Sequence, residues 1–157
     1  MADETTVRFL YPQNFVGTFD KYEKGHLRYI VQCTSISDGT GEAETIKVRR
    51  TDLRNTDGDT PKALIIEKIE YQIQSAANTT GVAGPRVNIE YDNTNSDLVA
   101  VLQRGEGCLD FSKHGGFRPT VETEDGQLDL GNIIFNTEDC YANDTYTITL
   151  HIRVSSK

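Results

Sequence analysis

The sequence predicts an all-β fold: a single antiparallel β-sandwich with jelly-roll or Greek-key wiring and an extended N-terminal arm. Residues 87–91 alternate apolar and polar side chains, turn-forming residues follow at 92–97, and residues 98–102 form a second apolar run. This order is typical of a β-hairpin. Residues 145–154 alternate in the same way. The hydrophobic content of 36% and the mean hydropathy of −0.50 suit thin β layers better than a thick helical core.

Length and charge limit the function classes. A chain of 157 residues with a net charge of −8 is most simply one acidic domain, and its surface repels phosphate backbones. No apolar run approaches the ~20 residues that a membrane span needs. We therefore expect neither nucleic acid nor a membrane as partner, and synthesis in a reducing host cytoplasm. Three cysteines without CxxC spacing predict no disulfide framework and no zinc site.

Residues 1–25 differ from the β domain expected over 26–157. They hold five of the thirteen aromatic residues, and these form the candidate partner-contact set: Phe9, Tyr11, Phe15, Phe19 and Tyr22. One interpretation is a strand and loop that cap their own core. The other is an arm that lays aromatic anchors on a neighbouring subunit, because aromatics bury a large area at small entropic cost.

Strands are expected at several further places. Leu27, Tyr29, Val31 and Cys33 share one face, with Ile30 on a partly covered opposite face. Residues 44–50 alternate more weakly, and the basic cluster 47–50 is interpreted as a solvated strand face. In the segment 63–75 the period of two favours a strand over a helix. Its predicted inward residues are Ile65, Ile69, Tyr71 and Ile73.

Turns are expected between these strands. The segments 54–61, 76–85 and 120–130 are rich in turn formers or acidic residues, and Gly105-Glu106-Gly107 is interpreted as a turn. The sequence His114-Gly115-Gly116 predicts a tight bend, since paired glycines adopt positive φ at low cost.

No catalytic signature is present, and we expect that the protein is not an enzyme and carries no cofactor. His26, His114 and His151 are scattered, and His114 and His151 are interpreted as a turn residue and a solvated strand residue. Nucleophile-elbow, metalloprotease, P-loop and dinucleotide motifs are lacking. Asp57-Gly58-Asp59 does not have the spacing of a calcium-binding loop.

The C-terminal part, residues 63–154, carries an ordered set of short motifs. They are Glu90-Tyr91-Asp92, Asp97 to Leu102, Asp110-Phe111, Gly115-Gly116, Gly131 to Thr137, and Asp144 to Leu150. In this order they resemble a family of small virion structural proteins of tailed phages, many of them marine, with Tyr91 where Trp is expected. The resemblance implies a capsid decoration or cement protein on the head surface. It would bridge major capsid protein subunits as a homotrimer.

Two other structural roles remain open. One is a tail, neck or fibre component, which would be present in fewer copies than a cement protein. The other is a carbohydrate-binding module on the virion, which needs exposed aromatic residues on a sheet face or at loop tips. Tyr141 and the N-terminal aromatics are the candidates for that role.

Overall fold

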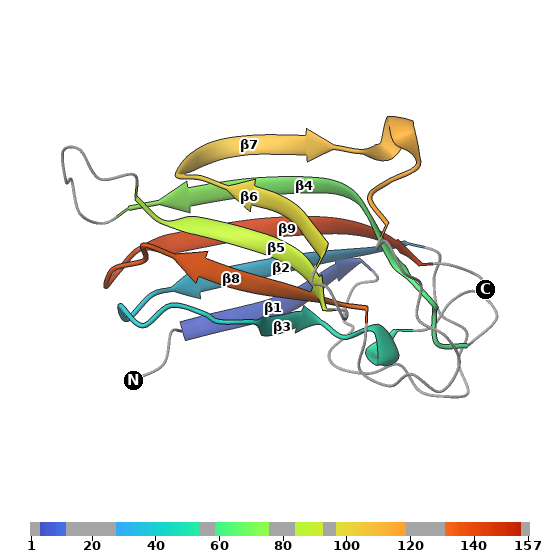
Figure 1. The fold of residues 1–157 in the computed structure, drawn as a ribbon, viewed down its shortest axis with the longest axis horizontal. Helices are drawn as coiled ribbons and strands as arrows, with labels where there is room; N and C mark the ends of the chain where they lie inside the picture. Colours follow the sequence, from blue (N-terminus) through green and yellow to red (C-terminus); the bar gives the residue numbers. More distant parts are fainter. Residues whose placement is uncertain are drawn as a thin grey trace.

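The computed structural model describes residues 4–11, 28–53, 59–75, 84–92, 97–118 and 131–154. Two antiparallel β-sheets lie face to face, as in a sandwich (Figure 1). In the described residues the helical elements are two short 3₁₀ turns, η1 (Arg50–Asp52) and η2 (Ser112–His114). The all-β prediction and its two antiparallel sheets are confirmed.

The larger sheet has five strands. In spatial order they are β1 (Glu4–Tyr11), β2 (Arg28–Ile36), β9 (Thr145–Val154), β4 (Leu64–Gln74) and β7 (Gly105–Asp110). The long central strands β2, β9 and β4 are those with the clearest alternation in the sequence. These three strands carry most of the residues that line a groove on the outer face of this sheet.

The smaller sheet has four strands. Their spatial order is β3 (Thr45–Val48), β8 (Asn132–Glu138), β5 (Arg86–Asp92) and β6 (Asp97–Leu102). The pair β5 and β6 is the predicted hairpin, and its existence is confirmed. The ladder contains a bulge between Ile89 and Glu90, which a simple period of two does not anticipate.

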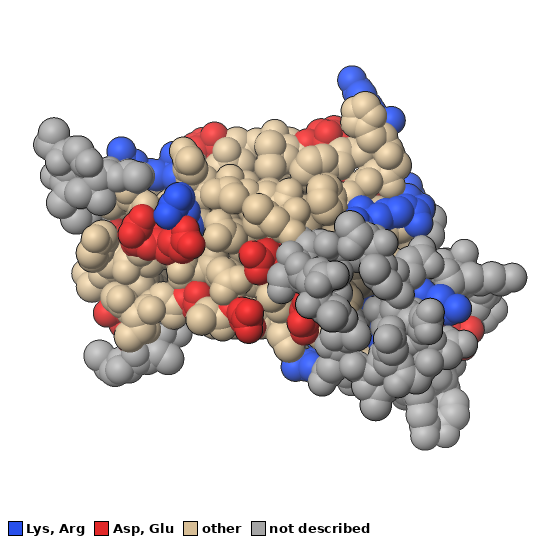
Figure 2. All heavy atoms as spheres, viewed as in Figure 1, with Lys and Arg blue, Asp and Glu red and all other residues tan. Residues whose placement is uncertain are grey.

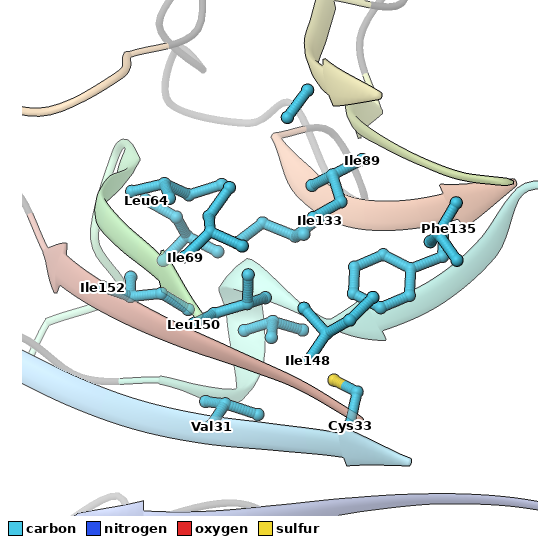
Figure 3. Close-up of a cluster of buried hydrophobic side chains, with 14 of the residues drawn as sticks. Val31, Cys33, Leu64, Ile69, Ile89, Ile133, Phe135, Ile148, Leu150 and Ile152 are labelled. Atoms are coloured by element: carbon cyan, nitrogen blue, oxygen red, sulfur yellow. The ribbon is translucent and has the colours of Figure 1, made fainter. Parts of the chain in front are cut away.

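The core fills the space between the two sheets (Figure 3). Successive side chains on a strand point to opposite faces, so each alternating segment contributes every second residue. In β9 these are Tyr146, Ile148, Leu150, Ile152 and Val154, all at most 5% exposed. The predicted inward faces of β9 and of residues 29–33 are confirmed. Burial of each large aliphatic side chain contributes about 1.5–3 kcal/mol.

The predicted inward face of β4 is wrong at one position. A bulge between Ile66 and Lys68 changes the parity of the strand, so that Ile66 enters the core and Ile65 pairs with Arg153 on the outer face. Ile65 is nevertheless fully buried, because the glycine bend after η2 covers it. The remaining inward residues, Ile69, Tyr71 and Ile73, lie against the core as expected.

The interpretation of the basic cluster 47–50 as a solvated face is wrong for two of its residues. A bulge between Ile46 and Val48 in β3 turns Lys47 into the sandwich, where its ammonium group contacts Glu42. Arg50 is 6% exposed and donates a 2.8 Å hydrogen bond to the carbonyl of Pro61. Buried cations need such partners, and neither partner is adjacent in sequence.

Two loop predictions also have clear outcomes. Gly105-Glu106-Gly107 is not a turn but the start of β7, which pairs with β4. Its small residues fit there because the Tyr71 ring lies against Gly107. The predicted bend at 114–116 is confirmed, with φ of 82° at Gly115 and 89° at Gly116. The acidic segment 120–130 and most of 54–61 and 76–85 lie outside the described residues.

Candidate functional site

The candidate partner-contact residues divide into three groups. Phe9 lies edge-on against Tyr29, with ring centroids 6.0 Å apart, so it contributes to its own core. Tyr11 is 48% exposed. Phe15, Phe19 and Tyr22 lie outside the described residues. The strand β1 pairs with β2 along the edge of the five-stranded sheet.

The five-stranded sheet carries a groove on its outer face, with a volume of about 650 Å³. Strand register explains how it is built: one row crosses all five strands. The row consists of Tyr11, Ile30, His151, Lys68 and Asp110. A bulge between Phe9 and Tyr11 brings Tyr11 into this row, opposite Ile30. Arg28, Glu67 and Ser112 complete the polar lining.

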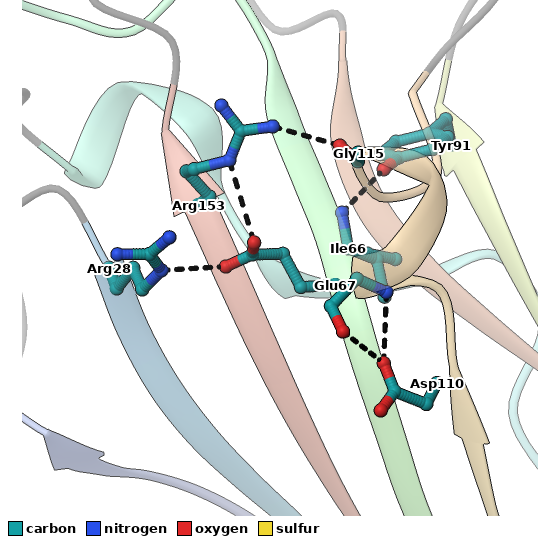
Figure 4. A network of polar contacts seen from close by, with 8 residues as sticks. Arg28, Ile66, Glu67, Tyr91, Asp110, Gly115 and Arg153 are labelled. Atoms are coloured by element: carbon teal, nitrogen blue, oxygen red, sulfur yellow. Dashed lines mark hydrogen bonds and ion pairs between the residues drawn. The ribbon is translucent and has the colours of Figure 1, made fainter.

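Glu67 is the centre of the charge network beside this row (Figure 4). It occupies the β4 bulge, so both Glu67 and Lys68 face outward. One carboxylate oxygen accepts a 2.9 Å hydrogen bond from Arg28, and the other lies 3.6 Å from Arg153 Nε. Arg153 also donates to the carbonyl of Gly115. One carboxylate, only 15% exposed, therefore joins three strands, and Arg153 extends the network to the glycine bend.

A second carboxylate, Glu70, lies against Lys68 and His151 on the same face. Lys68 Nζ lies 3.2 Å and His151 Nε2 lies 3.1 Å from the same Glu70 oxygen. The hydrogen bond from Lys68 is the main cause that lowers the pKa of Glu70. Solvent screens these exposed pairs, so they orient the side chains more than they stabilise the fold.

Asp110 lies at the end of the row, where β7 meets η2. Its Oδ1 accepts hydrogen bonds from the Ser112 hydroxyl and, at 2.9 Å, from the Ser112 backbone N–H. These hydrogen bonds lower the pKa of Asp110. The carboxylate is therefore held in its charged form and in a fixed orientation at the rim of the groove.

The buried polar cluster between the sheets has a different character. Lys47 contacts Glu42, and its ammonium group lies 5.7 Å from the Phe135 ring centroid and 5.9 Å from that of Tyr146. The Tyr146 hydroxyl donates to the other oxygen of Glu42. Burial raises the pKa of the nearby Cys33 thiol to about 12. These groups contact one another and are buried, so we assign them to the fold.

The residues that the structure describes hold neither a metal-binding cluster nor a membrane-spanning helix. They contain no group of three His, Cys, Asp or Glu side chains arranged to hold a metal ion. Within the same residues, no helix is long and apolar enough to cross a bilayer. Cys33, Cys108 and Cys140 are not joined by disulfide bonds.

The opposite face of the molecule is that of the four-stranded sheet. Figure 2 shows acidic and basic side chains interspersed with uncharged surface on this face. Asn88, Glu90 and Asn136 line its middle, and Asn136 donates a 2.8 Å hydrogen bond to Glu90. The described residues seen in this view form no continuous basic patch.

Comparisons with protein-family models, with curated proteins and with solved structures found no match to this chain. The groove on the outer face of the five-stranded sheet is therefore the candidate site on its geometry alone. Of its lining, sequence reasoning named Tyr11 as a contact candidate and interpreted His151 as a solvated strand residue, while Tyr29, Ile30 and Asp110 entered only as strand or motif residues. Alternation places Lys68 and His151 on outer faces, but it does not show that register aligns them, and the two bulges are not visible in the sequence.

Proposed function

We propose that this protein is a virion component that decorates the outer surface of a tailed-phage head and bridges major capsid protein subunits. The ordered motifs of residues 63–154 support this proposal, and so does a compact two-sheet domain with an edge that could receive a neighbour. The alternative of a tail, neck or fibre component differs mainly in copy number.

The proposed wiring of the domain is a jelly roll. The strand orders β2-β9-β4-β7 and β3-β8-β5-β6 support it. Among the eight strands from β2 to β9, the first pairs with the last and the pairing continues inward: β2 with β9, β3 with β8, β4 with β7, and β5 with β6. These pairs alternate between the sheets, as expected for a long hairpin rolled into a sandwich. Jelly rolls occur in viral capsid proteins and in lectins, so the wiring suits a virion role without specifying it.

We place the capsid-binding surface at the edge formed by β1. The proposal depends on the apolar side chains that are exposed beside this open edge. Of the large hydrophobic residues that are exposed in the described chain, Val7, Tyr11 and Ile36 lie on β1 and β2. In the described residues β1 has a strand on one side only, which leaves backbone groups open to a partner. Apolar side chains next to an open strand edge are typical of an interaction surface.

A pair of matched substitutions tests this surface. Val7→Lys places a charge on the β1 edge, where the side chain is 40% exposed. Val101→Lys places the same charge on β6, the edge of the other sheet, at 45% exposure. Deletion of residues 1–25 is less informative, because it removes a strand that pairs with β2.

The measurement is co-sedimentation of purified protein with heads that lack it. We expect Val7→Lys to weaken binding at least about tenfold, because burying an unpaired charge opposes association, while Val101→Lys binds normally. Equal binding of both variants, with unchanged thermal unfolding, would contradict the β1 surface. Quantitative mass spectrometry of the particle then separates the two virion roles. Hundreds of copies support decoration, and a few copies support the tail alternative.

A further inference from the structure

We propose that the groove across the outer face of the five-stranded sheet is a binding site for a neutral oligosaccharide. This inference goes beyond the capsid role and does not depend on it, since the groove would bind the same ligand on a free protein. It rests on the size of the groove, its exposed aromatic residue, its polar groups and its charge balance.

The groove has the dimensions of a ligand site. Its volume of about 650 Å³ lies inside the range of roughly 300–1,000 Å³ that is usual for small-molecule pockets. It extends across β1, β2, β9, β4 and β7, so its floor is formed by paired strands and not by a single loop. A site on paired strands holds its groups in place more firmly than a site on loops.

Tyr11 provides an aromatic surface at one side of the groove. The residue is 48% exposed although it pairs with Ile30 in the row. The face of an aromatic ring is apolar and carries partial negative charge, which suits the C–H face of a pyranose ring. An exposed tyrosine therefore suits a saccharide, which can stack on the ring, better than a ligand without an apolar face.

Polar groups line the remainder of the groove, from Arg28 on β2 to Asp110 on β7. Asp110 is oriented by Ser112, and Arg28 is oriented by Glu67. Arg28 is nevertheless 59% exposed, so donors of its guanidinium remain within reach of a ligand. A carboxylate presents two acceptors and a guanidinium presents a planar fork of donors, and both match neighbouring hydroxyl groups that donate and accept.

The charge of the lining favours a neutral ligand. Arg28 and Lys68 are balanced by Glu67 and Asp110, and both cations also lie against carboxylates. An anionic glycan would have to compete with Glu67 and Glu70 for these cations. A cationic ligand would meet Arg28 and Lys68. A neutral oligosaccharide keeps all existing ion pairs, and because these pairs already order the side chains, little further ordering is needed on binding.

The experiment uses the full-length protein, biotinylated and assembled on streptavidin so that weak sites gain avidity. The assembly is applied to an array of neutral oligosaccharides, with sialylated and sulfated glycans on the same surface. The strongest neutral hit is then titrated into the unlabelled protein by calorimetry. We expect binding to neutral glycans and none that depends on sialic acid or sulfate.

Matched variants assign the binding to the groove. Tyr11→Ala should weaken it about tenfold, as loss of an aromatic anchor does at other interfaces. Tyr11→Phe should retain it, because the ring face remains. Tyr141→Ala is the control, since Tyr141 is 55% exposed at the turn before β9, at the other end of that strand from the groove. Asp110→Asn should also weaken binding while thermal unfolding stays close to that of the wild type.

Three outcomes would overturn the proposal. The first is an array without any neutral hit, and the second is recognition that depends on sialic acid or sulfate. The third is a neutral hit that Tyr11→Ala does not weaken or that Tyr141→Ala abolishes, because the glycan would then lie elsewhere on the surface.

Discussion

At the scale of single residues, Lys47 shows how far the environment of a side chain can depart from its sequence context. It sits in a basic run on a short strand, yet its side chain is 2% exposed and contacts Glu42, itself 5% exposed. A buried ion pair costs desolvation for both charges, so its net contribution to stability is small or negative compared with an apolar pair. The ion pair holds Glu42, in the segment before β3, where its carboxylate also contacts the Tyr146 hydroxyl on β9.

The Lys47→Met substitution tests this residue. It keeps an unbranched side chain of similar length but leaves Glu42 buried without its cation, which costs about 3–5 kcal/mol of unfolding free energy. Urea denaturation followed by circular dichroism measures the loss.

The double variant Lys47→Met with Glu42→Gln is the control for this prediction. It removes both charges and should recover a large part of the lost stability. If the single variant is as stable as the wild type, the pair is not buried as the structure has it.

At the scale of elements, the 3₁₀ turn η2 and the two glycines after it determine the outer surface of β4. Phe117 exchanges two backbone hydrogen bonds with Ile66, of 3.0 and 2.7 Å, and so closes the turn over the strand. The Tyr91 hydroxyl, fully buried, lies 2.7 Å from the Phe117 carbonyl and 2.6 Å from that of Leu64. Tyr91 on β5 thus joins the two sheets, a contact that Trp could not make in the same way.

The two glycines give a matched pair of substitutions. Both have positive φ, so an alanine at either costs about 1–2 kcal/mol. A Cβ at Gly116 would also lie 2.5 Å from Ile65 Cγ2, whereas a Cβ at Gly115 meets nothing within 4 Å. We therefore expect Gly116→Ala to be less stable than Gly115→Ala by a further ~1–3 kcal/mol. Equal losses in denaturant unfolding would show that the bend does not press on Ile65.

At the scale of the whole molecule, an open sandwich leaves four strand edges, formed in the described chain by β1, β7, β3 and β6. Exposed edges promote association unless charge or shape prevents it. The β7 edge carries the exposed acidic residues Glu106 and Asp110, while the β1 edge carries Val7 and Tyr11. This difference favours β1 over β7 as the associating edge of the five-stranded sheet.

The homotrimer that the family resemblance implies can be measured directly. Native mass spectrometry of the purified protein should give a species of three times the 17.5 kDa chain mass, and Val101→Lys should leave it unchanged. A monomer at micromolar concentration would contradict a preformed trimer and restrict assembly to the capsid surface.

Local patterns were sufficient for much of the fold. Period-two alternation identified β9, β2 and the β5–β6 hairpin, because each strand has one face against the core and one toward solvent. Alternation failed at β3 and β4, where bulges change which residue points inward. It also failed at Gly105-Glu106-Gly107, where pairing with β4 makes these glycine-rich residues part of a strand.

The candidate site was less predictable than the fold. Its row of residues comes from five strands that are far apart in sequence, and only strand order and register align Tyr11 with Asp110. A one-residue difference in any register would move these side chains to the other face. Single-sequence reasoning has no access to that information.

By itself, then, the sequence determined the class of this protein: an acidic all-β domain whose strands alternate, with an aromatic-rich N-terminus and no recognisable catalytic motif. Tertiary structure alone decided that Lys47 is buried, that Ile66 and not Ile65 enters the core, and that Tyr11 faces a groove across five strands. The physical reason is the range of the interactions. Alternation and turn chemistry act between neighbours in sequence, whereas bulges, register and ion-pair partners are set by strands that meet only in the folded chain.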